Sequence, residues 1–307
     1  MKILVTGVAG FIASHIVDAY IGKGHQVFVV DDLSSGRREF VNPKAKFYQA
    51  DIRDRKKIHE IFVKEKPEIV NHHAAQISVR NSVEDPINDA EINLLGLLNL
   101  LEEGRTVGVK KVIFASSGGV VYGEAKKLPT PENYHPLQPL SPYGVTKLAS
   151  EYYLNFYRET YGIQSIALRY SNVYGPRQNP HGEAGVVAIF ALKLLKDEVP
   201  IINGDGLQTR DYVYVGDVVS ANLKSLEAKI SGSFNIGTGI ETNVVELFKE
   251  LKKITNSQIQ ATHGEAKTGE QKRSCLEASL AEKILKWKTQ ISLKEGLKKT
   301  VEYFLKK

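Results

Sequence analysis

The sequence predicts a doubly wound parallel α/β sheet with a smaller, interleaved C-terminal α/β lobe. Short β-branched runs alternate with helix-length segments over the first 170 residues. These runs are apolar on both faces, which is typical of strands that helices cover on both sides of a parallel sheet. After residue 170 the alternation stops and a long polar segment begins. We therefore expect one domain over 1–170 and a second lobe over 171–307.

The expected elements follow one another in the order strand, helix, strand. Expected strands cover residues 2–7, 25–31, 46–52, 68–75, 110–117 and 164–172, and expected helices cover 11–23, 54–64, 86–107 and 142–161. Crossovers between parallel strands are right-handed. The polar segment 171–185 is too long for an ordinary connection, which indicates a functional loop. Two later strands, near 212–215 and 233–237, are expected to rejoin the main sheet.

Composition excludes several classes of protein. The 307 residues are 42% apolar and 25% charged, which is ordinary for a globular protein. The single cysteine, Cys275, excludes an internal disulfide framework and a cysteine-based zinc cluster. No basic run with interleaved aromatic residues supports nucleic-acid binding, although the net charge is +6. No apolar run has membrane-spanning length, and no cleavage site follows the apolar start, so we expect a cytoplasmic protein.

A glycine motif connects the first strand to the first helix. Gly7 and Gly10 stand in "VTGVAGF", and Ala13 occupies the third position of the pattern. Glycines there allow a tight turn and a close backbone approach to a pyrophosphate on the helix N-terminus, and a small third residue suits helix–strand packing. This context predicts a Rossmann-type nucleotide-binding domain.

Two aspartates end the next strands. Asp31 lies 21 residues beyond Gly10, the position of a ribose-binding carboxylate. A carboxylate repels a 2′-phosphate, so NAD is expected, although Arg37 and Arg38 keep NADP as an alternative. Asp51 ends the third strand, where it either meets the adenine amino group or contributes to the cap of the next helix.

The fourth strand ends in "NHHAAQ". His72 and His73 are adjacent on a strand and point to opposite faces, so a shared metal is not expected. The small Ala74 and Ala75 favour backbone lying close to a cofactor.

The fifth strand and the helix that starts at Pro142 carry candidate catalytic groups. Ser116 or Ser117 could bind a substrate oxygen, or both belong to a serine-rich turn; no GxSxG motif supports serine hydrolase chemistry. In "YGVTK", Tyr143 and Lys147 lie one helical turn apart. A neighbouring ammonium favours the phenolate, which would make Tyr143 a base. The alternative is a chance pair on a solvated helix.

These motifs together carry a family resemblance. GVAGF, Asp31, HHAAQ, FASSGGVVYG, YGVTK, LRYSNVYGPRQ and RDYVYVGD, in this order, resemble the extended short-chain dehydrogenase/reductase family. Within that family the chain looks most like the UDP-glucose 4-epimerases. The resemblance spans nearly the whole chain and weakens after Asp217.

The resemblance implies a mechanism. Tyr143 would remove the proton of the sugar 4-hydroxyl while hydride passes from C4 to NAD, and Ser117 would hold the 4-oxygen. Lys147 and the positive nicotinamide would lower the pKa of Tyr143. The 4-keto intermediate would turn over and take hydride back on its other face. A homodimer formed through the helices that begin at Pro86 and Pro142 is also implied.

The resemblance also implies further contacts with the cofactor and with a UDP-sugar. Cofactor contacts are expected from Gly7, Gly10, Phe11, Ile12, Asp31, Asp32, Ser35, Gly36, Asp51, Ile52, His73, Ala74, Ala75, Asn93, Tyr143, Lys147 and Tyr170. Sugar-nucleotide contacts are expected from Ser117, Tyr143, Asn172, Val186, Arg210, Lys267, Glu270 and Ser274.

Three of these positions bear on the substrate. Lys267 replaces the arginine of the family's Arg-x-Gly-Asp/Glu motif, which here reads "KTGE", and Arg273 is a candidate to compensate. Glu270 keeps the carboxylate. A small Ser274 near the sugar C2 would leave room for an N-acetyl group; alternatively it only sits in a turn.

Sister activities differ in identifiable residues. The 4,6-dehydratases that the chain resembles carry an Asp–Glu pair after the serine of the fifth strand, where this sequence has Gly118 and Gly119. Uronate epimerases and decarboxylases are not separated by these motifs. From a different class, a non-catalytic NAD-sensing module is disfavoured because both Tyr143 and Lys147 are intact.

Overall fold

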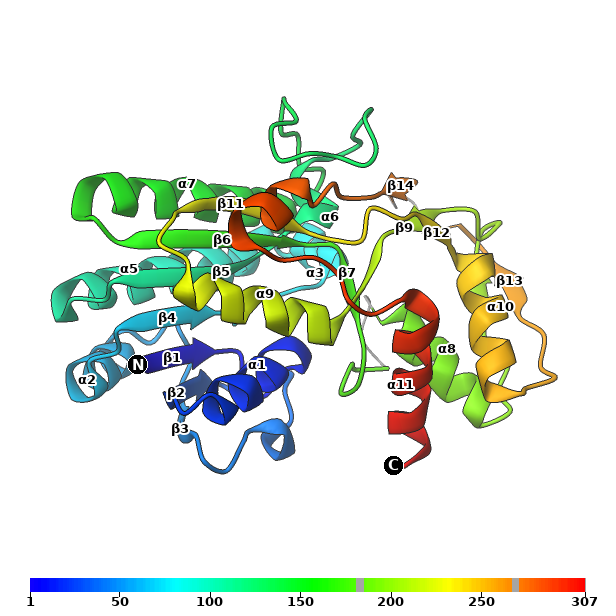
Figure 1. Ribbon diagram of the computed structural model, residues 1–307, viewed down its shortest axis with the longest axis horizontal. Helices are drawn as coiled ribbons and strands as arrows, with labels where there is room; N and C mark the ends of the chain where they lie inside the picture. The colour runs from blue at the N-terminus through cyan, green and yellow to red at the C-terminus, as the bar shows by residue number, and fades with distance from the viewer. Residues whose placement is uncertain (181–184, 267–270, 307) are drawn as a thin grey trace.

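The main sheet of the computed structural model has seven parallel strands (Figure 1). The structure describes residues 1–180, 185–266 and 271–306. The strand order is β11-β6-β5-β4-β1-β2-β3. The strands are β1 (Lys2–Thr6), β2 (Gln26–Asp31), β3 (Lys46–Gln49), β4 (Ile69–His72), β5 (Lys111–Ser117), β6 (Gln164–Tyr170) and β11 (Gly232–Ile236). The predicted doubly wound α/β fold is confirmed.

Helices cover both faces of this sheet (Figure 1). Helices α1 (Phe11–Gly22) and α9 (Val215–Glu227) share one hydrophobic core with Ile3 and Val5 of β1. On the opposite face, a second core joins α2 (Arg55–Glu65), α5 (Gly96–Val107) and α7 (Pro142–Tyr161). Leu4 of β1, which lies between Ile3 and Val5 in the chain, belongs to this second core. Because successive strand side chains alternate between faces, a continuous apolar strand supplies both cores.

Helix α7 has the bounds that the sequence predicts. The Ser141 hydroxyl accepts a hydrogen bond from the Gly144 N–H, and Pro142 follows at the first helical position. Gly162 ends the helix in the left-handed conformation. Among the residues that the structure describes, no helix is long and apolar enough to cross a membrane.

The helical stretch expected over 86–107 contains a wider turn. It begins as α4 (Pro86–Ala90), passes through the π-helical turn η2 (Glu91–Leu95) and continues as α5. A short helix, α3 (Val79–Glu84), precedes it and was not expected from the sequence. Single π turns of this kind are frequent at functional sites.

The C-terminal lobe consists of very short strands and three helices around a separate core. Helices α8 (Val186–Leu195), α10 (Val244–Thr255) and α11 (Leu293–Leu305) bury Phe190, Leu247 and Leu297 there. Three small sheets pair β7 (Asn172–Tyr174) with β10 (Tyr212–Tyr214), β9 (Thr209–Arg210) with β12 (Thr242–Asn243) and β14 (Arg273–Ser274), and β8 (Ile201–Asn203) with β13 (Thr262–Gly264). The short elements α6 (Gly118–Val121), η1 (Arg38–Phe40) and η3 (Ala281–Leu285) complete the fold.

Only one of the two returning strands joins the main sheet. Strand β11 pairs with β6, as Phe234 opposite Leu168 shows. The expected return of 212–215 is wrong, because β10 pairs with β7 instead. Strand β11 lies beside β6, and this pairing extends to Ser171, the residue after β6, whose N–H donates to Ile236 O at 3.0 Å. The next residue, Asn172, donates to Asp211 O at 2.9 Å, so β10 replaces β11 beside the continuing chain. The division of the chain at residue 170 stays a prediction.

Candidate active site at the carboxyl edge of the sheet

The glycine loop forms an open cradle between β1 and α1. Gly7 has a φ of +74°, and a Cβ there would lie 2.6 Å from Ala74 N, so only glycine fits without displacing backbone. Gly10 precedes α1 and offers no side-chain cap, and the first turn holds no acidic residue. The first N–H groups of α1, including those of Phe11 and Ile12, therefore keep their capacity to bind an anion. This geometry fits the pyrophosphate of a dinucleotide.

Asp31 is tied to the same loop. Its Oδ2 accepts from Ala9 N–H at 2.9 Å and its Oδ1 from Leu33 N–H at 2.8 Å. The side chain is buried, and this burial raises the pKa of the Asp31 carboxyl. Each carboxylate oxygen retains a second acceptor site for a ribose hydroxyl. By contrast, Asp32 is occupied with its own turn, accepting from the Ser34 N–H and hydroxyl.

The segment after Asp31 packs against the glycine loop. The N–H of Arg37 donates to Ala9 O at 2.8 Å, and a Cβ on Gly36 would lie 2.5 Å from Ala9 Cβ. Ser35, beside Gly36, is exposed at this rim. The contact of Ser35 and Gly36 with a cofactor stays a prediction.

Asp51 does not cap the next helix. Asp54 is the N-cap of α2 and accepts from Lys57 N–H at 3.1 Å, so the capping interpretation of Asp51 is wrong. Asp51 instead forms an ion pair with Arg53 at 2.7 Å, and this contact lowers the pKa of the Asp51 carboxyl. Ile52 beside it is buried. A contact between Asp51 and adenine stays a prediction.

His72 and His73 point to different partners. His72 Nδ1 hydrogen-bonds the Thr6 hydroxyl at 2.7 Å, whereas His73 Nε2 lies 3.1 Å from the Tyr170 hydroxyl and its ring stacks on that of Tyr170. Burial lowers the pKa of His73 to about 3 and that of His72 well below its usual value. No group of three potential metal ligands occurs within residues 1–180, 185–266 and 271–306.

Two buried polar atoms at this edge have no partner from the described part of the chain. They are His73 Nδ1 and Ser171 Oγ. Buried polar groups are normally hydrogen-bonded, so such orphans indicate that a ligand supplies the partner. Together with the glycine cradle and the small side chains of Ala74 and Ala75, these two atoms fit a dinucleotide cofactor.

Strand alternation separates the two serines of β5. The Ser116 hydroxyl is buried and donates to Glu151 Oε1 at 2.5 Å. Ser117, half-buried at the end of β5, makes no capping bond to α6. At the next position a Cβ on Gly118 would lie 2.4 Å from Leu276 Cδ1. The space that an acidic side chain would need is therefore filled by Leu276.

Tyr143 and Lys147 share one face of α7, as their spacing predicts. The Lys147 ammonium lies 5.6 Å from the centroid of the Tyr143 ring and 4.8 Å from that of Phe114. It donates to Ala115 O at 2.8 Å, two residues before Ser117. The pair therefore lies beside the end of β5, where the serine is.

The charges of this pair are set by burial. Burial lowers the pKa of Lys147 to about 8, against the opposing influence of Asp89 and Glu151. Burial also raises the pKa of Tyr143, and the Asp89 carboxylate adds to this rise. The expected lowering of the Tyr143 pKa by Lys147 is not met by the chain alone, because desolvation of the phenolate outweighs the attraction of one ammonium.

The lobe brings predicted sugar-facing residues from distant segments together. Ser274 of β14 stands directly opposite Arg210 of β9, although 64 positions separate them in the chain. Ser274 is buried, and the Arg210 guanidinium donates to Thr209 O at 2.8 Å. Asn172 opens β7 and Val186 opens α8.

The predicted diphosphate contacts of the C-terminal motif are only partly visible. Lys267 and Glu270 lie outside the described residues. Arg273 donates from Nε to Glu241 Oε1 at 2.9 Å, and this contact raises the pKa of Arg273. Because its guanidinium is held by Glu241, the expected replacement of the family arginine by Arg273 gains no support.

Sequence reasoning missed Asp89. Its carboxylate is fully buried and accepts from the Thr146 hydroxyl, the Asn93 amide and the Gln76 amide, each at 2.9 Å. Asn93, which is expected to contact the cofactor, forms two hydrogen bonds with the backbone of Gln76. Its Oδ1 accepts from the Gln76 N–H, and its Nδ2 donates to Gln76 O. The available signal was the spacing of Asp89 and Asn93, one helical turn apart.

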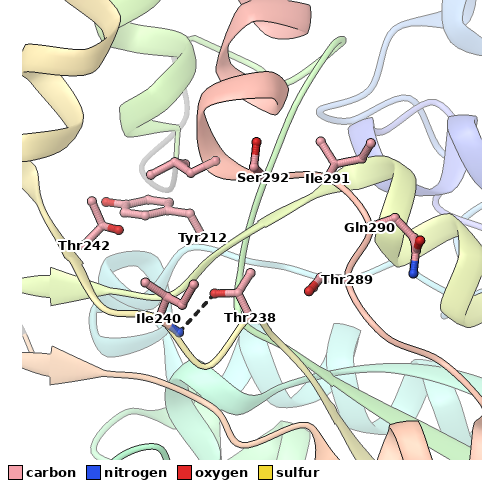
Figure 2. Close-up of a pocket in the computed structure, with 9 residues that line it drawn as sticks. Tyr212, Thr238, Ile240, Thr242, Thr289, Gln290, Ile291 and Ser292 are labelled. Carbon is pink, nitrogen blue, oxygen red and sulfur yellow. Dashed lines mark hydrogen bonds between the residues drawn. The ribbon is translucent and has the colours of Figure 1, made fainter.

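A separate hollow of about 210 Å³ lies between β10, the loop after β11 and the segment before α11 (Figure 2). Thr238, Thr242, Gln290 and Ser292 line it, and the Ile240 N–H donates to the Thr238 hydroxyl at 3.1 Å. The Tyr212 side chain also lines it. Among the described residues, none of the predicted site residues lines this hollow, so it is separate from the candidate site at the sheet edge.

The comparison with known families decides the class of the protein. The model of the "NAD dependent epimerase/dehydratase family" matches residues 3–237. The chain belongs to this family. The expected resemblance to UDP-glucose 4-epimerases is confirmed as well. The UDP-glucose 4-epimerase of Mycolicibacterium smegmatis is 44% identical, over 100% of this chain and 99% of the relative.

Solved structures agree with this family membership. The UDP-glucose 4-epimerase of Thermotoga maritima, solved with UDP-glucose, superposes with a TM-score of 0.98 at 50% identity and covers 100% of this chain and 99% of that one. The enzyme of Thermus thermophilus, solved with NAD, gives a TM-score of 0.95 at 42% identity and covers 99% of both chains. This epimerase is an NAD-dependent nucleotide-sugar enzyme.

Proposed function

We propose that this epimerase interconverts UDP-glucose and UDP-galactose through a transient 4-keto sugar, with Tyr143 as the base. The observation that carries the proposal is the joint position of Tyr143, Lys147 and Ser117 at the carboxyl edge of the sheet. Lys147 contacts the backbone of β5 two residues before Ser117. The similarity to the Thermotoga maritima enzyme solved with UDP-glucose supports this substrate class.

The residues of the site divide the chemistry among them. When bound, NAD supplies the hydride acceptor and, in its oxidised form, a positive charge beside the phenol. Tyr143 takes the proton of the sugar 4-hydroxyl and later returns it. Because burial raises the pKa of Tyr143, deprotonation requires that positive charge in addition to the Lys147 ammonium. The Ser117 hydroxyl donates to the 4-oxygen as negative charge develops on it.

The cofactor end of the site supports NAD rather than NADP. Asp31, the expected ribose-binding carboxylate, is held by two backbone N–H groups. Arg38 is engaged with the Phe47 ring, 4.2 Å from its centroid. Extraction of the purified protein should therefore release NAD, and mainly NADP would contradict this.

A second substrate class has one specific observation in its favour. Ser274 is small and buried, and it stands beside Arg210. A small side chain at this position leaves room for an acetamido group, so UDP-N-acetylglucosamine and UDP-N-acetylgalactosamine are the second candidates. UDP-glucuronate has no comparable observation.

A panel of nucleotide sugars tests the proposal. The purified enzyme is incubated with UDP-galactose, UDP-N-acetylgalactosamine and UDP-galacturonate, and each 4-epimer is resolved by chromatography. We expect UDP-galactose to reach equilibrium with UDP-glucose. Turnover of the uronate alone would contradict the proposed sugar, and no turnover of any sugar would favour the NAD-sensing module.

We also infer a homodimer through α4 and α7. These helices pack against each other, yet they expose Ile87 on α4 and Val145, Tyr152 and Phe156 on α7. The α7 residues recur at spacings of seven and four, so they share one face. An exposed apolar face of this kind normally meets a partner surface. Sedimentation should give a dimer for the wild type and a monomer for Tyr152→Glu; a monomeric wild type would contradict the inference.

A cytoplasmic location stays a prediction.

A further inference from the structure

Asp89 is a buried acid that touches the turn carrying the proposed catalytic pair. Its Oδ2 accepts from the hydroxyl of Thr146, the residue immediately before Lys147. Its Oδ1 accepts from the side-chain amides of Asn93 and Gln76. Helix α4 thus holds α7 through one carboxylate, at the turn between Tyr143 and Lys147.

The second buried acid near Lys147 differs in one respect. Glu151 is paired with the Arg169 guanidinium at 2.7 Å, and both side chains are almost completely buried. The groups that donate to Asp89 are a hydroxyl and two amides, all of them neutral. The Arg169 guanidinium therefore offsets part of the charge of Glu151, which still raises the pKa of Lys147. The charge of Asp89 acts on both members of the pair, because it raises the pKa of Tyr143 as well as that of Lys147.

The other groups that face Lys147 do not supply a balancing charge. His72 and His73 on β4 have pKa values lowered by burial, His73 to about 3, so they are neutral near pH 7. Phe114 and Ala115 of β5 contribute a ring face and a carbonyl oxygen. Tyr143 is the remaining titratable group on the same face of α7.

We propose that Asp89 is a positioning residue that keeps Lys147 protonated in the buried site while fixing the helical turn of Tyr143 and Lys147. This inference rests on the proposed roles of that pair. The Asp89 carboxylate also has an unfavourable effect, because it opposes formation of the Tyr143 phenolate. Asp89 therefore sets the pH window of the reaction as well as the geometry.

Asp89→Asn removes the charge and preserves the hydrogen-bonding pattern. The new amide oxygen can accept from Asn93 and Gln76, and the new NH₂ can donate to Thr146 Oγ1. The Thr146 proton then goes to Tyr143 O, which already lies 3.0 Å away. Thr146→Val is the matched control, because it removes the hydrogen bond between Thr146 and Asp89 and keeps the carboxylate.

The direction of the expected shift follows from the sign of the charge. Removing a negative charge destabilises the ammonium of Lys147 and stabilises the phenolate of Tyr143, so the pKa of each falls. Both limbs of the pH profile of kcat/KM should move to lower pH, by about one unit. Thr146→Val should lower the rate without moving the limbs. An Asp89→Asn profile that stays in place would overturn the proposal.

A spectroscopic readout separates this inference from the proposed function. The absorbance of tyrosinate in the NAD-loaded enzyme, measured as a difference against Tyr143→Phe, reports the pKa of Tyr143 without any turnover. We expect this pKa to fall in Asp89→Asn, and an unchanged value would contradict the proposal. Activity of Tyr143→Phe would instead refute the proposed base. Should Asp89→Asn not fold, Asp89→Ser also removes the charge, and the same shift is expected.

Discussion

The half of this epimerase that carries the glycine cradle, here called the cofactor half, and the C-terminal lobe are built by different means. In the cofactor half, Gly7, Ala9 and Asp31 belong to one strand–helix–strand unit, and backbone N–H groups make the contacts that join them. In the lobe, β9, β12 and β14 have two residues each and come from three distant segments. There the Glu241 carboxylate joins the segments, accepting from Thr209 and Arg273.

This difference assigns different consequences to substitutions in the two halves. A site made of backbone geometry is damaged by any side chain that changes the path of the chain, and the loss appears as lost cofactor. A site made of side chains on short strands can change its selectivity while the fold persists. Tyr143 and Lys147, on the long helix α7, lie beside the end of β5 at the carboxyl edge of the sheet.

The largest effect is expected from Tyr143→Phe, at the end of β5. The variant loses only the titrating hydroxyl, so epimerisation should fall by roughly 10³-fold or more. The bound NAD should remain, because the cradle at Gly7 is untouched. Turnover and released NAD are measured on the same preparation. Retention of a large share of the activity would place the base elsewhere.

In the cofactor half, Gly7→Ala should cost occupancy by NAD. The alanine Cβ would lie 2.6 Å from Ala74 N at a φ of +74°, a strain of about 1–3 kcal/mol before the displaced backbone is counted. Gly22→Ala in the same strand–helix unit is the control, because a Cβ there has open space. NAD content and the thermal midpoint are measured for both. Equal NAD content in the two variants would refute the close-approach argument.

Substitution of the two serines of β5 should affect different quantities, the rate of the reaction at Ser117 and the stability of the fold at Ser116. Ser117→Ala removes one donor to the developing charge and should lower kcat by about 10²-fold. Ser116→Ala removes the donor to buried Glu151 and should cost about 1–3 kcal/mol of the free energy of unfolding, with a smaller effect on kcat. If Ser116→Ala proves the more damaging for kcat, the assignment of the two serines is reversed.

The smallest effect on the principal reaction is expected in the lobe, from Ser274→Tyr. Added bulk beside Arg210 should suppress turnover of N-acetylated sugars and change UDP-galactose turnover only a few-fold. Ratios of kcat/KM for the two substrates measure this selectivity. If the wild type turns over no N-acetylated sugar, the argument from the size of Ser274 fails; equal losses for both sugars would mean a packing role.

The sequence by itself determined the features whose causes are local. The alternation of apolar runs predicted the sheet, Ser141, Pro142 and Gly162 mark the ends of α7, and the glycine motif predicted the cradle. Spacing within one helix was enough to place Tyr143 and Lys147 on a common face. Each of these depends on residues within a few turns of one another, so periodicity and capping chemistry suffice.

The tertiary structure decided what depends on partners far along the chain. Whether 212–215 would join the main sheet depended on β11, which already occupies the edge beside β6. The partner of the Ser116 hydroxyl is Glu151 from α7, and the pKa of Tyr143 depended on burial and on Asp89. Desolvation and long-range pairing leave no periodic trace in a sequence, because they arise only when distant segments meet.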